Sequence, residues 1–127
     1  MIDYATAGEW LEAYGRALET FDGDAWVALF TDDAEYLDNP FGTALVGHNA
    51  VRAYLLDASA SHRDVEYTVE RHWVSGTTIL AAWHVTFVRK ASGQVVRMAG
   101  FLAAEVASDG RVSRFREWTV YAPDGRG

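Results

Sequence analysis

The chain has 127 residues, no cysteine and a formal net charge of −7, from 11 basic and 18 acidic side chains. This length fits one domain, which we place over residues 1–127, and the lack of cysteine excludes disulfides, thiolate nucleophiles and zinc–sulfur sites. The acidic balance disfavours phosphate backbones and anionic lipid surfaces, so we expect neither nucleic acid nor membrane as a partner.

A first helix is predicted near the amino end of the sequence. Thr6 and Glu9 have the spacing of a capping box. From Trp10 to Phe21 the apolar side chains recur at helical spacing and give the helix one apolar face. The Asp-Gly pair that follows is typical of a helix end, so we expect the helix to stop there.

Two further helices and one short strand are predicted in the next segment. Asp24 should cap a short helix that runs to Phe30, and the polar run 31–33 should break it. A short strand over residues 34–38 then ends at an Asn-Pro turn. Gly47 precedes a third helix with apolar side chains on one side.

The second half of the sequence changes to the two-residue period of strands. Apolar and polar side chains alternate from Val65 to Val69, and longer strands follow over 78–89, 95–106 and 112–121. Helices first and a meander afterwards indicate an α+β fold. We predict a cone-shaped, curved antiparallel (mixed) sheet with three helices on its concave face, closing as a barrel around one apolar pocket.

The last predicted strand has two chemically different faces. One face carries Arg114 and Arg116, and the other carries Phe115, Glu117 and Tyr121. Burying two unpaired arginines costs more free energy than burying one carboxyl group, which can take up a proton. We therefore predict that Glu117 points inward among aromatic groups.

Two other environments for Glu117 remain open. It would also fit at the mouth of the barrel, or inside it in a pair with His84 or an arginine. The bulkier face of strand 78–89 includes Trp83 and Phe87 and is expected inside, which turns His84 toward a partner subunit or solvent. The remaining histidines are expected at the surface: His48, His62 and His72.

Tyr36 and Asp38 share one face of the short strand over residues 34–38. Asp38 stands just before an Asn-Pro pair, so it is either a turn-former or a rim residue of the pocket, across from Glu117. Two carboxyl groups that converge on an apolar cavity are suited to proton transfer, because their surroundings can separate their pKa values.

The sequence contains 17 aromatic residues, namely five Trp, six Tyr and six Phe, which either fill a large core or line a cavity. The side chains expected to shape the pocket are Tyr14, Phe30, Phe41, Tyr54, Trp83, Phe87, Met98 and Phe115. Nucleophile elbows, phosphate-binding glycine loops, dinucleotide fingerprints and zinc-protease motifs are absent from the sequence. We therefore expect no cofactor and no metal.

Several short motifs resemble the nuclear-transport-factor-2-like superfamily, in its SnoaL-like polyketide-cyclase and ketosteroid-isomerase-like branch. They are Asp24, the run 29–34, the run 40–42, Gly47, the run 109–112, and Glu117 with Trp118. The resemblance covers nearly the whole chain and implies the same cone-shaped fold. It implies several activities, since the superfamily includes isomerases, cyclases, dehydratases, epoxide hydrolases and non-enzymes.

The resemblance also suggests roles for single residues. Tyr36 and Asp38 match a limonene epoxide hydrolase stretch in which a Tyr and an Asn help hold the attacking water, and Glu117 matches that enzyme's catalytic Asp. The epoxide hydrolase also has an Arg and a second Asp on its middle strand. The corresponding inward positions here are Trp83 and Val85, so this chain departs from the epoxide hydrolase pattern.

In ketosteroid isomerase the catalytic base immediately precedes a proline, and in this chain Asn39 occupies that position. Leu102 falls near the position of the isomerase's oxyanion-holding Asp, so this chain lacks the donor found there.

We predict a cofactor-independent acid/base enzyme that isomerises, cyclises or dehydrates a small, mostly apolar, oxygen-bearing molecule. Glu117 would be the general acid/base, Asp38 the second carboxyl group, and Tyr36 a hydrogen-bond donor to developing oxyanion charge. The alternatives are a non-catalytic domain that binds an apolar small molecule, and a dimeric adaptor domain with a vestigial pocket.

A homodimer through the outer face of the sheet is also expected, because Leu80, His84 and Trp118 give that face apolar area. The sequence has no apolar run long enough to span a bilayer, and its first residues lack the layout of a signal peptide. Both features favour the cytoplasm.

Overall fold

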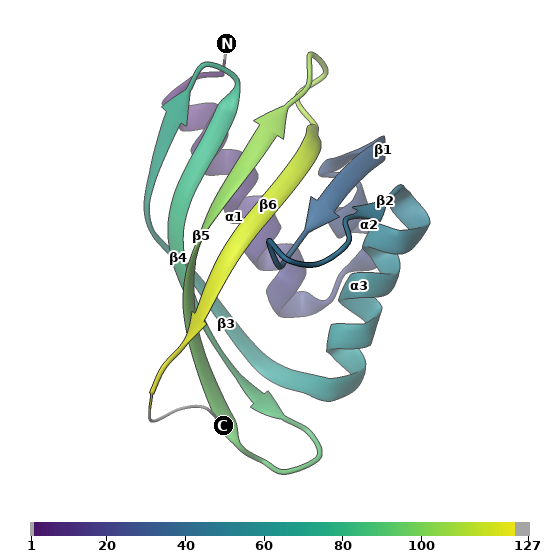
Figure 1. The fold of residues 1–127 in the computed structure, drawn as a ribbon, viewed down its shortest axis with the longest axis vertical. Coiled ribbons are helices and arrows are strands. Elements are labelled where there is room, and N and C mark those ends of the chain that lie inside the picture. The colour runs from purple at the N-terminus through teal and green to yellow at the C-terminus, as the bar shows by residue number, and fades with distance from the viewer. Residues whose placement is uncertain (1, 124–127) are drawn as a thin grey trace.

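The computed structural model describes residues 2–123 and shows three helices against one sheet (Figure 1). In chain order the elements are α1 (Tyr4–Thr20), α2 (Gly23–Val27), β1 (Phe30–Leu37), β2 (Leu45–Val46), α3 (His48–Ser61), β3 (His62–Ser75), β4 (Thr78–Arg89), β5 (Val95–Val106) and β6 (Val112–Tyr121). The predicted α+β order is confirmed, and the last three strands have the predicted bounds.

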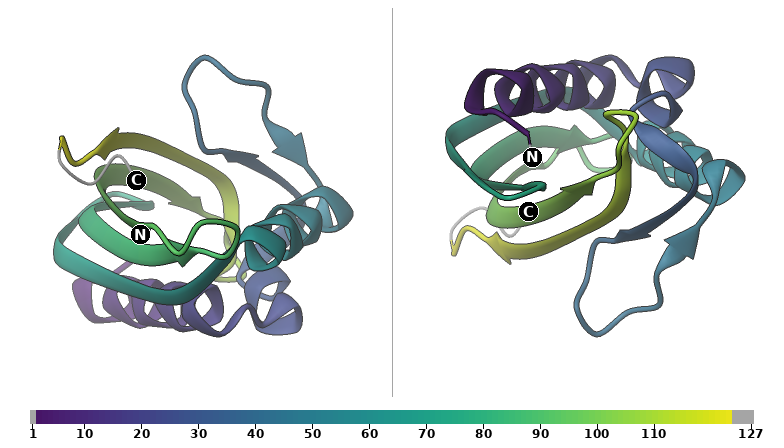
Figure 2. Two further views of the ribbon diagram at one scale, coloured as in Figure 1. Left: turned by 90° about the horizontal axis from the view of Figure 1, so that it is seen from below. Right: turned by 90° about the horizontal axis from the view of Figure 1, so that it is seen from above.

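The sheet has the strand order β2-β1-β6-β5-β4-β3. All neighbouring strands are antiparallel except β1 and β6, which run parallel. Figure 2 shows the strong curvature of this sheet, with α1 along β3 and α3 beside β1. The predicted curved, mixed sheet with three helices is therefore confirmed. The prediction that the sheet closes into a barrel is wrong, because β2 and β3 are its two edge strands and do not pair with each other.

The caps of the first two helices differ from the prediction. Helix α1 begins two residues earlier than expected, and the Asp3 carboxylate accepts a hydrogen bond of 2.7 Å from the backbone N–H of Thr6. Helix α2 is capped by Asp22, whose carboxylate accepts from Ala25. In both cases the carboxylate lies three residues before the N–H it satisfies, so Thr6 and Asp24 belong to the first turns and not to the caps.

Strand β1 begins earlier than predicted, at Phe30, and includes the polar run 31–33 that was expected to end a helix. Thr31 is buried, whereas Asp32 and Asp33 point to solvent. Phe30 pairs with Val112 of β6 and, after a register shift, Glu35 pairs with Arg114. The pairing on both sides of the run 31–33 overrides its local preference for a turn. Strand β2, only two residues long, was not predicted.

The core is an aromatic cluster beneath α1. Tyr36 and Phe115 stack with their ring centroids 4.6 Å apart and their planes 5° apart, and Tyr14 stacks on Phe115 at 5.2 Å. Trp10 meets Phe30 edge to face at 5.8 Å. This cluster holds the rings of Tyr14 and Tyr36 rigidly, so their hydroxyl groups have fixed positions. None of the helices in the described part of the chain is both long and apolar enough to cross a membrane.

Candidate active site

A cavity of about 770 Å³ lies between the helices and the inner face of the sheet. Side chains from α1, α3, β1 and β3 to β6 line it, together with the loop that follows β1. Phe41 in that loop is 97% exposed and Tyr121 at the end of β6 is 51% exposed, so these two residues mark its mouth. A cavity of this size can hold a small organic ligand.

Most of the predicted lining residues face this cavity: Tyr14, Phe41, Tyr54, Trp83, Phe87 and Met98. The structure corrects the prediction for Phe30 and Phe115, which are completely buried and do not line it. Both rings lie in the core, where Phe115 stacks against Tyr14 and Tyr36. They support the cavity wall and do not form its surface.

Glu117 lies on β6 and points into this apolar space, as the comparison of the two strand faces predicted. Only 8% of its surface is exposed. Burial, and secondarily the negative charge of Asp38, raises the pKa of the Glu117 carboxyl to about 8. No hydrogen bond from any residue within 2–123 stabilises its charged form. Glu117 is therefore mostly protonated at neutral pH, which is the state a general acid needs.

Asp38 follows the end of β1 at the rim of the cavity and is exposed. Its charge acts on Glu117 across the cavity, so the structure brings the two predicted carboxyl groups together. The Glu117 carboxyl is buried among apolar groups, whereas the Asp38 carboxyl is exposed to solvent. This difference in surroundings is the arrangement that lets one group act as an acid while the other acts as a base.

Three tyrosine hydroxyl groups lie beside these carboxyls, each from a different element. The hydroxyls of Tyr14 on α1 and Tyr36 on β1 share a buried hydrogen bond of 3.0 Å. Tyr54 on α3 packs against Tyr36 with ring centroids 4.8 Å apart, and the charges of Glu117 and Asp38 add to the effect of burial on its pKa. Burial is the main cause that raises the pKa of all three phenols, so they stay protonated and can donate.

From the sequence, only Tyr36 is predicted to be a polar member of this group. Tyr14 and Tyr54 were predicted as apolar lining residues, because helical spacing places them on buried faces but says nothing of where their hydroxyls end. His62 was predicted at the surface, yet it lines the cavity and packs against Phe87 at 4.0 Å. Burial, then the charge of Arg89, lowers the pKa of His62.

The other histidines lie outside the cavity. His48 contacts the Phe30 carbonyl at 2.8 Å, His72 contacts the Tyr4 carbonyl at 3.0 Å, and His84 is exposed. Among residues 2–123, no group of three or more His, Asp or Glu side chains is arranged to hold a metal ion. The chemistry that this site offers is acid/base chemistry supported by hydrogen-bond donors.

Residues 11–115 match the family described as SnoaL-like domain. None of the curated proteins is similar enough to match the chain. Among solved structures, the epoxide hydrolase/cyclase-like enzyme SalBIII of polyether salinomycin formation is 18% identical with a TM-score of 0.82, over 98% of this chain and 97% of that one.

Two proteins of Mycobacterium tuberculosis are similar as well. An LEH-like epoxide hydrolase is 21% identical with a TM-score of 0.77, over 95% of this chain and 86% of that one. Rv0760c, solved in complex with estradiol-17beta-hemisuccinate, is 21% identical with a TM-score of 0.77, over 94% and 96%. At these identities the likeness shows the fold alone.

Proposed function

Because the chain belongs to the SnoaL-like domain family, we propose that it is a cofactor-independent acid/base enzyme. Its substrate would be a small, mostly apolar, oxygen-bearing molecule that enters the cavity, and its reaction an isomerisation, cyclisation or elimination. One observation carries the proposal: Glu117 is a buried carboxyl whose pKa is raised to about 8, and it faces an open cavity beside a second, exposed carboxyl.

The proposed mechanism divides the proton transfers between the two carboxyls. Asp38, exposed at the rim, takes a proton from a carbon next to a carbonyl or hydroxyl group. Glu117, protonated, gives a proton to the departing or rearranging end of the molecule. In an elimination the products are an alkene and water; in an isomerisation the proton only changes position. The linked hydroxyls of Tyr14 and Tyr36 stabilise negative charge that develops on the substrate oxygen.

Deuterium exchange tests this proposal without knowledge of the natural substrate. Cyclic ketones such as 1-tetralone exchange the hydrogens beside their carbonyl in D₂O, and NMR measures the rate with and without protein. Glu117→Gln keeps the shape of the side chain and removes its titration, so we expect exchange to fall by roughly 100–10,000-fold. The matched control is Glu105→Gln, a partly exposed carboxyl outside the cavity. Equal rates in wild type and Glu117→Gln would contradict the proposed role.

A non-catalytic binding domain is the second candidate. The cavity is lined mostly by apolar and aromatic side chains, and Rv0760c, which shares the fold, was solved with a steroid ester. Under this alternative, ketones bind equally well to wild type and Glu117→Gln, and neither version accelerates exchange. The measurement of binding and exchange on the same samples separates the two functions.

We also propose that two copies of the chain associate through the outer face of the sheet. Trp73, Phe101 and Trp118 on that face are 38%, 37% and 40% exposed. Trp73 and Phe101 pack together at 6.0 Å, and Phe101 pairs across the strands with Trp118. Apolar area gathered in this way is characteristic of interfaces. Light scattering should give a dimer mass, and Phe101→Arg should give a monomer; a monomeric wild-type protein at micromolar concentration would refute this proposal.

A further inference from the structure

Two buried side-chain donors in the described part of the chain lack a hydrogen-bond partner: the Tyr67 hydroxyl and the indole N–H of Trp83. The fold satisfies its other deeply buried indoles. Trp10 donates to the Leu29 carbonyl and Trp26 to the Val51 carbonyl, each at 3.1 Å. Since buried polar groups in proteins are nearly always paired, the two exceptions require a reason.

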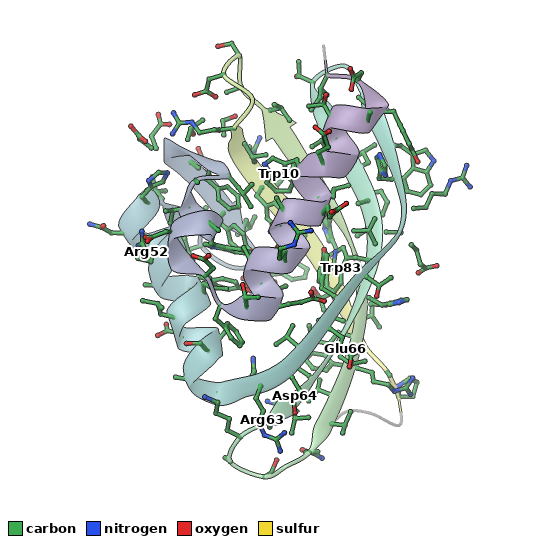
Figure 3. All side chains as sticks on the ribbon, turned by 180° about the vertical axis from the view of Figure 1, so that it is seen from behind. Trp10, Arg52, Arg63, Asp64, Glu66 and Trp83 are labelled. Atoms are coloured by element: carbon green, nitrogen blue, oxygen red, sulfur yellow. The ribbon has the colours of Figure 1, made fainter. Side chains whose placement is uncertain are left out.

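The two exceptions lie side by side. The rings of Tyr67 on β3 and Trp83 on β4 stack with centroids 5.6 Å apart and planes 24° apart. Both residues line the cavity. Figure 3 shows Trp83 in the interior between α1 and the sheet. The unpaired donors therefore belong to one wall of the cavity and are not scattered defects of the core.

The surrounding backbone is shaped to hold both rings in this place. Gly100 on β5 pairs directly with Trp83, and a Cβ atom there would lie 2.5 Å from the indole Cζ2. Gly15 on α1 faces the Tyr67 ring, with a Cβ position 3.1 Å from its Cδ1 atom. Larger residues at either glycine would displace the rings, so the wall depends on both.

We propose that Tyr67 and Trp83 form a donor subsite that binds one hydrogen-bond-accepting oxygen of the ligand, such as a ketone, ester or lactone carbonyl. This inference rests on the proposed function only in taking the cavity as the ligand site. An indole N–H donates and cannot accept, so the bound atom must be an acceptor. An ammonium group has no acceptor lone pair and would leave the Trp83 indole unpaired, which disfavours a cation at the subsite.

The electrostatic surroundings agree with a neutral or partly negative oxygen at this position. Burial, and secondarily the Glu117 charge, raises the pKa of Tyr67 well above its usual range, so the phenol keeps its proton. Both unpaired atoms are almost completely covered, so the proposed subsite requires the two rings to rotate before a ligand oxygen can bind. Side-chain rearrangements of this size commonly accompany binding.

The indole N–H of Trp83 can report on the subsite directly. In ¹H–¹⁵N spectra its resonance is identified by its loss in Trp83→Phe. The probes are 1-tetralone and tetralin, which have the same carbon skeleton and differ by one carbonyl oxygen. We expect 1-tetralone to move the Trp83 indole proton downfield and tetralin to leave it nearly unshifted. The indole of Trp26, already paired with Val51, is the internal reference.

Affinities of the two probes provide the second measurement. Tyr67→Phe and Trp83→Phe should each weaken 1-tetralone binding about three- to tenfold, which is the size of one neutral hydrogen bond, and leave tetralin binding within about twofold. The matched controls Tyr4→Phe and Trp73→Phe change exposed residues outside the cavity and should change neither affinity. If Trp83→Phe does not fold, the affinities of Tyr67→Phe for the two probes still decide.

Three results would overturn the subsite: no difference between the two probes at the Trp83 resonance, unchanged ketone affinity in Tyr67→Phe, or no binding of either probe at millimolar concentration. Glu117→Gln separates this inference from the proposed catalysis. That variant should keep the ketone-induced indole shift even if deuterium exchange is lost. A normal shift without any exchange in wild type would reject the enzyme and retain the subsite.

Discussion

Replacement of Tyr67 by Phe should stabilise the protein in the absence of ligand. The change removes one oxygen atom that is buried without a partner and leaves the ring, its stacking on Trp83 and its edge contact with Tyr14 in place. An unpaired buried hydroxyl costs about 1–3 kcal/mol. We therefore expect the free energy of unfolding to rise by about 1 kcal/mol or more, with a rise in Tm of a few degrees.

Tyr36→Phe is the comparison, because it removes a buried hydroxyl that is paired with Tyr14 at 3.0 Å. That variant should lose about 1–3 kcal/mol, because it leaves the buried Tyr14 hydroxyl without this partner. Urea denaturation, followed by tryptophan fluorescence at constant pH, measures both changes. Opposite signs support the reasoning. A Tyr67→Phe protein that is destabilised as much as Tyr36→Phe would refute it, since Tyr67 must then have a partner in solution.

Three further perturbations follow from the same geometry. Burial raises the pKa of Glu117 from 4.5 to about 8, so the native state binds the proton more tightly than the unfolded state. The free energy of unfolding should therefore fall by roughly 3–5 kcal/mol as pH rises from about 4.5 through 8. Denaturation midpoints of wild type and Glu117→Gln should diverge across this range, and parallel curves would count against a buried carboxyl. Gly100→Ala places a Cβ atom 2.3 Å from the Trp118 carbonyl oxygen and 2.5 Å from the Trp83 ring. It should lower the free energy of unfolding by more than about 2 kcal/mol in urea titrations. A neutral effect would show that the Trp83 ring is not held against Gly100. Phe41→Ala removes a side chain that is 97% exposed at the cavity mouth. The free energy of unfolding should change by less than about 0.5 kcal/mol, while 1-tetralone binding measured by calorimetry should weaken. Unchanged binding would show that Phe41 does not belong to the binding site.

How far the sequence predicts this protein depends on the kind of information each feature needs. The inward position of Glu117 followed from the sequence because a strand has only two faces, and one of them carried Arg114 and Arg116. The bounds of β4, β5 and β6 agree with the prediction, since alternation and turn residues are local signals, whereas β3 (His62–Ser75) extends beyond the predicted alternation on both sides. The prediction for the polar run 31–33 is wrong because Phe30 and Glu35, on either side of this run, pair with β6, which is far away in the sequence.

Local sequence patterns do not predict how the polar groups of the cavity are arranged, for a different reason. Tyr14, Tyr36 and Tyr54 come from α1, β1 and α3, and their hydroxyls meet only through the tertiary arrangement. Spacing identifies the buried face of each element but not the direction of one phenolic oxygen. The same limit applies to Tyr67 and Trp83, whose lack of partners is a property of the packed structure.

The unfavourable features of this fold gather in one place. A buried carboxyl without a hydrogen-bond donor and two donors without an acceptor all line the same cavity, whereas the indoles of Trp10 and Trp26 in the core are paired. Sequences that only had to fold would lose such groups, because apolar replacements of the same shape are more stable. Glu117 offers a proton and the Tyr67–Trp83 wall offers two further donors, so a single ligand with accepting oxygens would satisfy all of them. The groups that weaken the fold are therefore the ones on which both the proposed function and the proposed subsite depend.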